Sequence, residues 1–469
     1  MLTIFERSET GRRGFELPPL TIPEYKLDGA YLTQTKSELP EVAEIDVVRH
    51  YTELSRKAFG VDNGFYPLGS CTMKYNPKIN EVVVGLDGFT EIHPTQDNVQ
   101  GCLGLMYGLN EKLKAITGMN FSLQPAAGAH GELTGLMIMR AYHLSRHDYA
   151  RTKIIVPDSA HGTNPASAAL AGFEIINIPS LEDCGVDLEE LRNACGEDTA
   201  GFMLTNPSTL GIFEEKIAEI EKIVHGCGGL MYYDGANLNA IMGIARPADM
   251  GFDIMHINLH KTFSTPHGGG GPGAGPVGCK DFLAEFLPYP IVRKDGERFE
   301  FYRPARTIGK VKSFYGNFLV LVRAYAYILT LGADGIKDAA QKAVLNANYL
   351  KHLLADIDWK KGQGCMHEFV LSMQKLKDET GVTALDVAKA MLDEDMHAPT
   401  MYFPSIVHEA LMFEPTETES KATLDDAAQK ILNIIKRAYE NPGDVKDTPK
   451  NACIARPDEV NAARNPKIR

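Results

Sequence analysis

The segment Ile254–Pro276, IMHINLHKTFSTPHGGGGPGAGP, joins an apolar run to one lysine and then to a turn rich in glycine. The run Ile254–Ile257 predicts a buried strand, and Lys261 follows where the chain leaves that strand. Partial burial favours the neutral amine, which is the form that makes a Schiff base with an aldehyde. Glycines lack a Cβ and leave room for a bulky group beside the backbone. A surface lysine next to a flexible loop is the alternative, and this segment alone does not decide between them.

Other apolar runs precede this segment, and they alternate with helical patterns. The predicted strands are 153–157, 174–178, 201–205 and 230–234, and the predicted helices include 132–145, 165–172, 188–194 and 217–225. Continuous apolar runs between helices indicate strands that are buried on both faces, which is typical of parallel sheets. The sequence therefore predicts an α/β domain with a mostly parallel sheet, whose ligand site lies beyond the carboxyl ends of the strands.

The length of 469 residues predicts more than one domain. We expect an N-terminal arm over 1–60, with a helical pattern at 47–59, and a large ligand-binding domain over 61–330. A long helical stretch at 316–357 leads into a smaller C-terminal α+β domain over 331–445, with a strand at 368–372 and helices at 383–394 and 422–439. Residues 446–469 form a polar tail. Proline-bearing arms of this kind commonly wrap a partner subunit.

The composition disfavours several classes of function. A formal net charge of −13 argues against a nucleic-acid-binding protein and against binding to an anionic membrane surface. The eight cysteines contain no CxxC pair, which disfavours a zinc site and a disulfide scaffold and fits a reducing cytoplasm. The apolar stretch 318–331 contains Arg323 and is short for a membrane span, so we interpret it as a buried helix. We predict a soluble cytoplasmic protein.

Asp234 closes the predicted strand 230–234 and is followed by a Gly-Ala-Asn turn. A carboxylate at a buried strand end requires a cationic partner, because an unpaired buried charge is costly. A pyridinium nitrogen is such a partner, and keeping it protonated is what makes pyridoxal phosphate an electron sink. An aspartate that accepts backbone N–H groups in a turn is the alternative. Lys261, which follows at another strand end, favours the cofactor interpretation.

The stretch Gln124–Glu132 supplies a candidate phosphate site, because its small residues open a predicted helix whose first N–H groups can reach an anion. Gly128 and Ala129 are the expected contacts. His161, in the segment 158–165, can lie flat on a cofactor ring; a helix-capping turn in which Thr163 or Asn164 is the cap is the other interpretation, and the two can hold together. His260 is a candidate catalytic residue beside the lysine, or a core histidine.

Two further residue patterns have simpler interpretations. His143 and His147 stand four residues apart on a predicted helix, but no third ligand is near, so we interpret them as solvated and predict no metal site. Cys71 is interpreted as a buried, inert thiol rather than a redox group.

Seven long motifs together resemble the glycine cleavage system P-protein, the pyridoxal-phosphate enzyme also called glycine dehydrogenase (aminomethyl-transferring). They are the opening segment, YYDGAN at 232–237, DSAHGTNPASA at 158–168, AAGAHGE at 126–132, YPLGSCTMKYNP at 66–77, HAPTMYFP at 397–404 and FEPTETESK at 413–421. The resemblance runs from about 12 to about 440. Only the lysine-bearing second half of that family's long chain is present, which is similar to subunit 2 of the split bacterial form.

The resemblance implies an aspartate-aminotransferase-like large domain, the pyridoxal-phosphate fold type I. It implies that Lys261 forms the Schiff base with pyridoxal 5'-phosphate, that Asp234 partners the pyridine nitrogen and that His161 stacks on the ring. His260 is expected to assist catalysis. The implied partners are a homologous subunit 1, a lipoylated H-protein and glycine, with the 268–271 loop and residues 70–72 lining the channel for the lipoyl arm.

Two other functions stay open at this point. The first is another pyridoxal-phosphate lyase or decarboxylase acting on a small amino acid. It stays open because no single residue identifies glycine as the substrate. The second is an inert structural partner of an active subunit, which the joint presence of Lys261, Asp234 and His161 disfavours.

Overall fold

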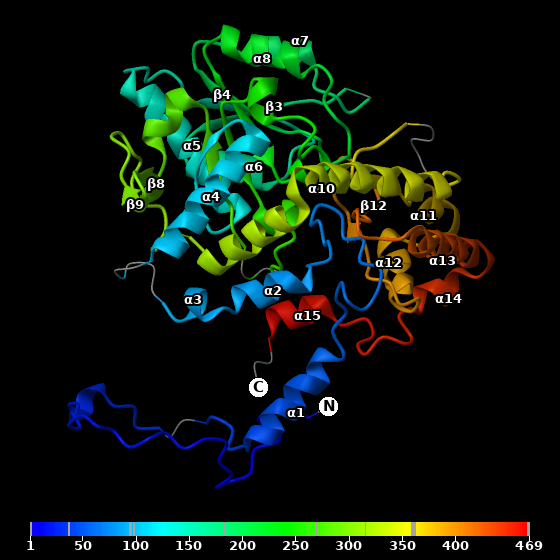
Figure 1. The fold of residues 1–469 in the computed structure, drawn as a ribbon. Coiled ribbons are helices and arrows are strands. Elements are labelled where there is room, and N and C mark those ends of the chain that lie inside the picture. Colours follow the sequence, from blue (N-terminus) through cyan, green and yellow to red (C-terminus); the bar gives the residue numbers. More distant parts are fainter. Residues whose placement is uncertain are drawn as a thin grey trace. The chain divides into compact units, whose positions relative to one another are not determined.

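The chain forms two compact units, one over 64–448 and the other over 1–63 together with 449–469. The computed structural model describes residues 2–35, 38–92, 96, 99–181, 183–268, 271, 273–314, 316–357 and 363–466. Each unit is described by itself below, and Figure 1 labels the elements along the chain.

A seven-stranded sheet forms the centre of the larger unit, in the order β1-β7-β6-β5-β4-β2-β3. Its strands are β1 (Asn120–Ser122), β2 (Lys153–Pro157), β3 (Glu174–Ile178), β4 (Thr199–Thr205), β5 (Leu230–Gly235), β6 (Ile254–Ile257) and β7 (Val277–Cys279). The strands from β6 to β3 are parallel, whereas β7 runs antiparallel to β6 and β1 antiparallel to β7. The predicted mostly parallel sheet is confirmed, and the short strands β1 and β7 are additions.

Both faces of this sheet are covered, which explains the continuous apolar runs. Successive side chains of a strand point to opposite faces. Phe202 and Tyr233 accordingly belong to one buried cluster, and their neighbours Met203 and Tyr232 belong to another on the opposite face. The helices around the sheet are α4 (Gln100–Thr117), α5 (Gly128–Ser145), α6 (Thr163–Leu170), α7 (Leu188–Ala194), α8 (Ile217–Gly226) and α9 (Leu259–Thr262), with 3-10 helices η2 (Leu238–Ala240), η3 (Pro247–Met250) and η4 (Asp281–Phe286).

Helix α10 (Phe318–Leu353) differs from the single helical stretch predicted over 316–357. It contains Gly332 at φ 64° and ψ −172°, a conformation that interrupts the helix and that glycine adopts at little cost. Among the described helices only α10 is long and apolar enough to cross a membrane by length and composition. Its residues Val320, Leu321 and Val322 are buried in the protein, so this helix belongs to the core. The predicted domain boundary after 330 lies beside the break and stays a prediction.

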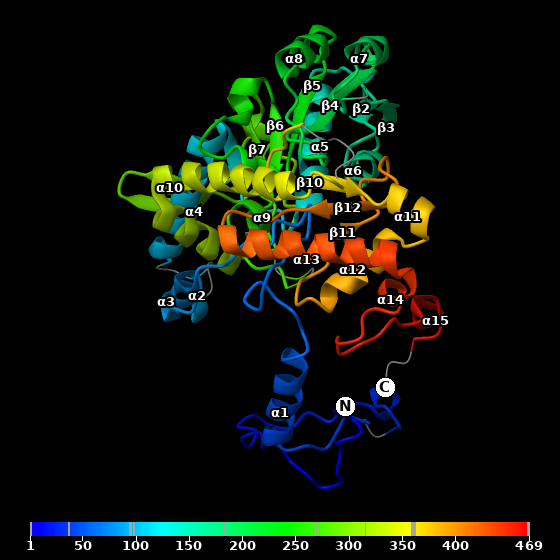
Figure 2. The same cartoon turned by 90° about the vertical axis from the view of Figure 1, so that its right-hand side faces the viewer.

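A smaller antiparallel sheet follows, in the order β10-β12-β11, with β10 (Phe369–Ser372), β11 (Thr400–Met401) and β12 (Ala410–Phe413). Its helices are α11 (Gln374–Thr380), α12 (Ala384–Leu392), α13 (Lys421–Glu440) and α14 (Pro442–Lys446) (Figure 2). Thr383 and Asp386 form a capping box at the start of α12, and Ser420 caps α13, which explains where these helices begin. Helices α2 (Lys78–Val84) and α3 (Asp87–Thr90) and the hairpin β8 (Ile291–Asp295) to β9 (Arg298–Tyr302) complete this unit.

The other unit contains η1 (Gly29–Tyr31), α1 (Glu44–Ser55) and α15 (Glu459–Arg464). Helix α1 begins three residues before the predicted start because the Asp46 carboxylate accepts the Ala43 N–H at 3.0 Å and caps its first turn. Large apolar side chains of this unit lie on the surface, with exposed fractions of 78% for Phe15, 83% for Leu17 and 76% for Leu20.

Candidate active site

A cavity of about 240 Å³ lies at the carboxyl ends of β4 and β5, beside α9 and the start of α5. All six site residues predicted from the sequence line it, namely Gly128, Ala129, His161, Asp234, His260 and Lys261. The fold thus brings together residues that are up to 133 positions apart in the chain, from 128 to 261. This is the place where parallel α/β sheets bind ligands.

Asp234 lies near the end of β5, and its carboxylate is 3% exposed. Its oxygens accept the Ala236 N–H and the Asn164 amide, each at 2.9 Å, and His256 Nε2 lies 3.3 Å from Oδ1. Burial opposes ionisation, but the surrounding charges and hydrogen bonds, those of His256 first, outweigh burial and lower the pKa of Asp234. The carboxylate therefore carries its negative charge at neutral pH, as a partner of a cationic ring nitrogen must.

A second buried carboxylate, Glu132, organises the wall beside Asp234. It accepts the Thr163 hydroxyl at 2.9 Å, the Asn164 amide at 3.2 Å and the Ser167 hydroxyl at 3.0 Å. The side chains of Thr163 and Asn164 therefore do not cap α6, in contrast to the alternative considered from the sequence. Asn164 instead bridges the two carboxylates and fixes their spacing.

His161 lies at the cavity wall, where its Nδ1 accepts the Thr163 N–H at 3.2 Å. On its other side the ring approaches Phe403, with 5.3 Å between centroids and 59° between planes. These contacts fix the orientation of the imidazole. Its stacking on a cofactor stays a prediction.

Lys261 belongs to the four-residue helix α9, which directly follows β6. Its ammonium Nζ has no hydrogen-bond or ion-pair partner among the described residues. Lys74, also buried nearby, differs: its Nζ contacts the Glu417 carboxylate at 2.9 Å and the Thr262 carbonyl at 3.1 Å. Lys74 is thus committed to an ion pair, while Lys261 is available for chemistry.

His260 is held neutral beside Lys261. Burial, followed by the charges of Lys261 and His267, lowers the pKa of His260 to about 3. Its Nδ1 is buried without a hydrogen-bond partner in the described part of the chain. A Cβ on Gly273 would lie 2.9 Å from this nitrogen, so the glycine is needed for the approach.

The start of α5 has the features of an anion site. The N–H groups of Gly128 and Ala129 have no acceptor among the residues that the structure describes, as expected for a first helical turn. A Cβ on Gly128 would lie 2.5 Å from Asn258 Oδ1, which itself is buried and unpaired within the described residues. Free N–H groups at a helix start, approached without side-chain obstruction, bind phosphate well.

These groups fit pyridoxal phosphate. The cofactor requires an amine for its aldehyde, a carboxylate for its ring nitrogen and N–H donors for its phosphate. The cavity presents the three at Lys261, Asp234 and the start of α5. The unpaired buried Thr205 hydroxyl, at the end of β4, is a further polar group facing this space.

Sequence reasoning missed several residues of this site. Glu132, Thr205, His256 and Asn258 line the cavity, yet none was singled out. His256 carried a usable signal, because it is the polar residue next to the end of an apolar strand and strand side chains alternate in direction. Asn258 offered no comparable signal, since its contact with Gly128 joins distant segments.

Two minor interpretations change. His143 is not solvated: it is 2% exposed, and its Nε2 lies 2.9 Å from the Ala200 carbonyl oxygen. The reason is that its helix turns this face toward β4. Cys71 is partly buried and not fully enclosed, and burial raises the pKa of its thiol. Of the predicted channel loop, residues 269 and 270 lie outside the described residues.

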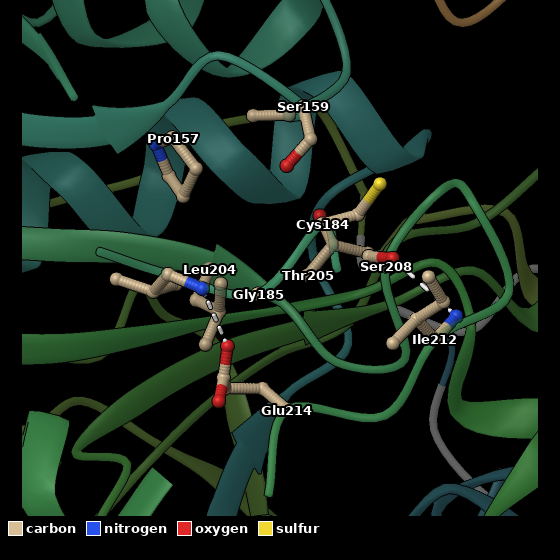
Figure 3. Close-up of a pocket in the computed structure, with 11 residues that line it drawn as sticks. Pro157, Ser159, Cys184, Gly185, Leu204, Thr205, Ser208, Ile212 and Glu214 are labelled. Atoms are coloured by element: carbon tan, nitrogen blue, oxygen red, sulfur yellow. Dashed lines mark hydrogen bonds between the residues drawn. The ribbon is translucent and has the colours of Figure 1, made fainter. Parts of the chain in front are cut away.

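A much smaller cavity of about 20 Å³ is lined by residues that include Thr205, Ser208 and Glu214 (Figure 3). Glu214 accepts the Val186 N–H at 2.7 Å, and the Ile212 carbonyl accepts the Ser208 N–H at 2.8 Å. This space holds roughly one water molecule and no cofactor.

Comparison with known proteins identifies close relatives. A family described as the C-terminal domain of glycine dehydrogenase matches residues 339–456. The probable glycine dehydrogenase (decarboxylating) subunit 2 of Treponema denticola is 61% identical over 472 residues, covering 99% of this chain and 98% of the relative. The protein of the same name from Thermotoga petrophila is 58% identical over 472 residues, covering 100% of this chain and 99% of the relative.

Solved structures share the fold at low identity. A glycine decarboxylase (P-protein) of the glycine cleavage system, in inhibitor-bound form, aligns with a TM-score of 0.70 at 20% identity, over 89% of this chain and 91% of that chain. A sphingosine-1-phosphate lyase of Burkholderia pseudomallei aligns with a TM-score of 0.60 at 13% identity, over 91% and 95%. The predicted fold class, the pyridoxal-phosphate fold type I with a smaller α+β part, is confirmed.

Proposed function

Because the chain belongs to the family of glycine dehydrogenase (decarboxylating) subunit 2, we propose that it decarboxylates glycine with pyridoxal phosphate and passes the aminomethyl group to the lipoyl arm of an H-protein. In this reaction the C–C bond of glycine breaks and CO2 leaves. The aminomethyl carbon bonds to one sulfur of the lipoyl disulfide, and the other sulfur takes up one proton. The proposal rests on one observation: Lys261, Asp234 and the start of α5 line the same cavity.

The chain's own groups would hold the cofactor at three points. Lys261 supplies the amine for its aldehyde, Asp234 faces its ring nitrogen, and the N–H groups of Gly128 and Ala129 receive its phosphate. When bound, pyridoxal phosphate supplies the electron sink for the negative charge that remains on the glycine α-carbon after CO2 leaves. Asp234 stabilises the positive ring nitrogen at that moment, because its low pKa keeps the carboxylate ionised.

The two histidines have separate tasks in this proposal. His161, held by Thr163 and Phe403, orients the ring and covers one of its faces. His260 stays neutral near pH 7 and is therefore able to accept or donate a hydrogen bond without adding charge beside Lys261.

The rival function is another pyridoxal-phosphate lyase or decarboxylase acting on a small amino acid. Visible spectra of the protein with its partner subunit, recorded before and after addition of glycine, serine or alanine, separate the two. We expect glycine alone to change the spectrum and to exchange its carboxyl group with bicarbonate. A larger response to serine or alanine would favour the rival, and a protein without cofactor absorbance would indicate an inert subunit.

Reduction with borohydride should attach the cofactor to Lys261. Its amine is unpaired among the described residues, while Lys74 is bound to Glu417. Peptide mapping by mass spectrometry locates the label, and the Lys261→Ala variant serves as the unlabelled control. A label on Lys74, Lys280 or Lys310 would contradict the assignment.

We further propose that the chain works with a homologous subunit 1, as the name subunit 2 of its relatives suggests. The exposed apolar side chains of the N-terminal arm support this, because exposed patches of this kind usually mark interaction sites. The isolated chain should therefore show little glycine activity. Full carboxyl exchange by this chain with a lipoyl carrier and no other subunit would contradict the proposal.

Charges on the arm should weaken assembly. Burying one leucine contributes about 1.5–3 kcal/mol, so the double variant Leu17→Glu/Leu20→Glu should bind subunit 1 at least about tenfold more weakly. Sedimentation or titration calorimetry with purified subunit 1 measures the affinity. Leu170→Glu, at a leucine that is 73% exposed outside the arm, is the matched control and should bind normally. If the arm variant bound subunit 1 as tightly as the wild type does, the arm would be excluded from the interface.

A cytoplasmic location also belongs to this proposal. None of the eight cysteines lies in a disulfide among the described residues. Free thiols are typical of a reducing compartment. Fractionation of cells with an antibody to the chain tests the location.

A further inference from the structure

Two buried glutamates lie opposite each other at one end of the smaller sheet. Glu368 directly precedes β10 and Glu414 directly follows β12, and the antiparallel ladder between these strands ends at the pair Phe369 and Phe413. Residues that face each other across such a ladder have neighbouring side chains. Both glutamates are 0% exposed. Two carboxyl groups therefore meet in a place that water does not reach.

The two carboxyl groups hold the turn formed by residues 70–72. The Ser70 N–H donates to Glu368 Oε2 at 2.8 Å, and the Thr72 N–H donates to Glu414 Oε2 at 2.9 Å. Ser70 has φ 64° and Thr72 has φ 46°, a left-handed conformation that is unfavourable for residues with a side chain. The hydrogen bonds offset this strain. Since Ser70 lines the cavity of Lys261, the pair determines the shape of one cavity wall.

The remaining oxygens of the pair are not equivalent. Glu368 Oε1 accepts the Asn237 amide at 3.1 Å, so both Glu368 oxygens are occupied. Glu414 Oε1 has no donor within the described part of the chain. His367 Nε2 lies 3.8 Å from both Oε1 atoms, and it too is unpaired there. A proton on the pair therefore fits at Glu414 Oε1 without breaking any of these hydrogen bonds.

The electrostatics of the two carboxyl groups favour such a proton. Burial raises the pKa of Glu414 to about 7. Burial and the charge of Glu414 raise the pKa of Glu368 well above its usual range. One oxygen of each carboxyl group lies within 4.8 Å of the other, and two carboxylates that close in a dry environment cannot both ionise cheaply. The pair therefore holds one proton, for which Glu414 Oε1 is the position without a hydrogen-bond donor among the described residues.

The positive charges near Glu368 and Glu414 can balance one negative charge on the pair, but they cannot balance two. Lys261 and Lys74 lower the pKa of Glu414, yet Lys74 is already paired with Glu417. His367 adds no positive charge, because burial, followed by Lys261 and Lys74, lowers its pKa to about 3. The Cys71 thiol stays neutral because burial raises its pKa.

We propose that Glu368 and Glu414 share one proton, carry one negative charge between them and act as positioning residues that fix Ser70 and Thr72 at the cavity wall beside Lys261. The catalytic consequence rests on the proposed function: the single charge stabilises a positive nitrogen at Lys261, and the fixed turn shapes the space for glycine. The shared proton itself is a property of the protein without cofactor.

The first experiment uses the cofactor-free protein and single and double Glu→Gln variants. Infrared difference spectra at pH 7 should show the carbonyl stretch of one buried protonated carboxyl group in the wild type. This band should be absent from Glu368→Gln and from Glu414→Gln, because the remaining glutamate then carries the charge. Absence of the band in the wild type, or its persistence in both variants, would overturn the shared proton. Stoichiometric bound metal, measured by elemental analysis, would overturn it as well.

The second experiment titrates the visible absorbance of the cofactor-loaded protein. Each single Gln variant keeps one negative charge and both backbone acceptors, so its midpoint should match the wild type. The double variant Glu368→Gln/Glu414→Gln loses the charge, and its midpoint should fall by roughly 1 pH unit. Equal shifts in both single variants would show that both glutamates are ionised in the wild type. Failure to load the cofactor would count against the proposed function and leave the infrared result to decide the pair.

The positioning role predicts a rescue pattern in steady-state kinetics of the chain assembled with subunit 1 and supplied with a lipoyl carrier. Glu414→Leu removes the acceptor of the Thr72 N–H and should raise the glycine KM roughly tenfold, whereas Glu414→Gln restores the acceptor and should give a normal KM. Glu409→Gln is the matched control, because Glu409 directly precedes β12, at the end opposite to Glu414, and its carboxylate forms an ion pair with Lys377. It should change neither KM nor the titration midpoint. A raised KM in Glu414→Gln equal to that in Glu414→Leu would contradict the positioning role.

Discussion

The Asp234→Asn variant should lose glycine decarboxylation by a factor on the order of 10²–10³ while it still binds the cofactor. The loss of one preorganised electrostatic contact to a developing charge typically costs this much in kcat. The amide keeps the size of the carboxylate and still accepts the Ala236 N–H. It lacks the negative charge that His256 and Asn164 maintain in the wild type. The cofactor remains held at Lys261 and at the start of α5, so its affinity should fall much less than turnover.

Single-turnover kinetics and cofactor titration measure the two quantities separately. Asp249→Asn is the control for the substitution itself, because Asp249 is an exposed partner of Arg246 and does not line the cavity. Thermal unfolding of the cofactor-free proteins reports any loss of folding. Near wild-type turnover of a loaded Asp234→Asn protein would remove Asp234 from the proposed role.

The Gly128→Ala variant should bind pyridoxal phosphate roughly 5- to 150-fold more weakly. A Cβ at Gly128 would lie 2.5 Å from Asn258 Oδ1, which is closer than real contacts allow. Overpacking of this kind costs about 1–3 kcal/mol, and 1.4 kcal/mol corresponds to tenfold in affinity. The added methyl group also displaces the backbone N–H groups that receive the phosphate. Equilibrium titration of the cofactor-free protein, followed by visible absorbance, measures the affinity.

Gly101→Ala is the matched control for this substitution. Gly101 also lies in the first turn of a helix, α4, but a Cβ there would meet nothing within 4 Å. Alanine is the better helix former, so this variant should be as stable as the wild type or more stable, with unchanged cofactor affinity. Equal cofactor affinity in Gly128→Ala and the wild type would exclude the start of α5 as the phosphate site.

The central sheet was predictable because each of its longer strands has a local run of apolar residues that indicates a strand. The runs 153–157 and 174–178 match β2 and β3 residue for residue, because short runs rich in isoleucine and valine between helical patterns mark strands. Most of β2 is buried, whereas β3 lies at the edge of the sheet with Glu174 and Asn177 exposed. The edge strand β1 and its neighbour β7 are three residues long, and such short strands carry no periodic pattern. The break in α10 was missed because Gly332 sits inside an otherwise helical pattern.

The candidate site was predictable where chemistry and strand ends coincide. Asp234 closes a predicted strand, and Lys261 and His161 each follow one, so one rule about parallel sheets placed them together. Glu132 was not predicted because it lies inside the pattern of helix α5. Its importance comes from Asn164, which bonds to it across 32 positions of the chain.

The sequence by itself determined the fold class, the family and the three groups that fit a pyridoxal-phosphate cofactor, because these depend on local patterns and on motifs long enough to be specific. Only the tertiary structure decided the ionisation of the site. The pKa of Asp234 depends on His256 and Asn164. The proton shared by Glu368 and Glu414 depends on the pairing of β10 with β12, which brings together two residues that are 46 positions apart in the chain. Burial and the distances between charges set these properties, and both arise only when distant segments pack together.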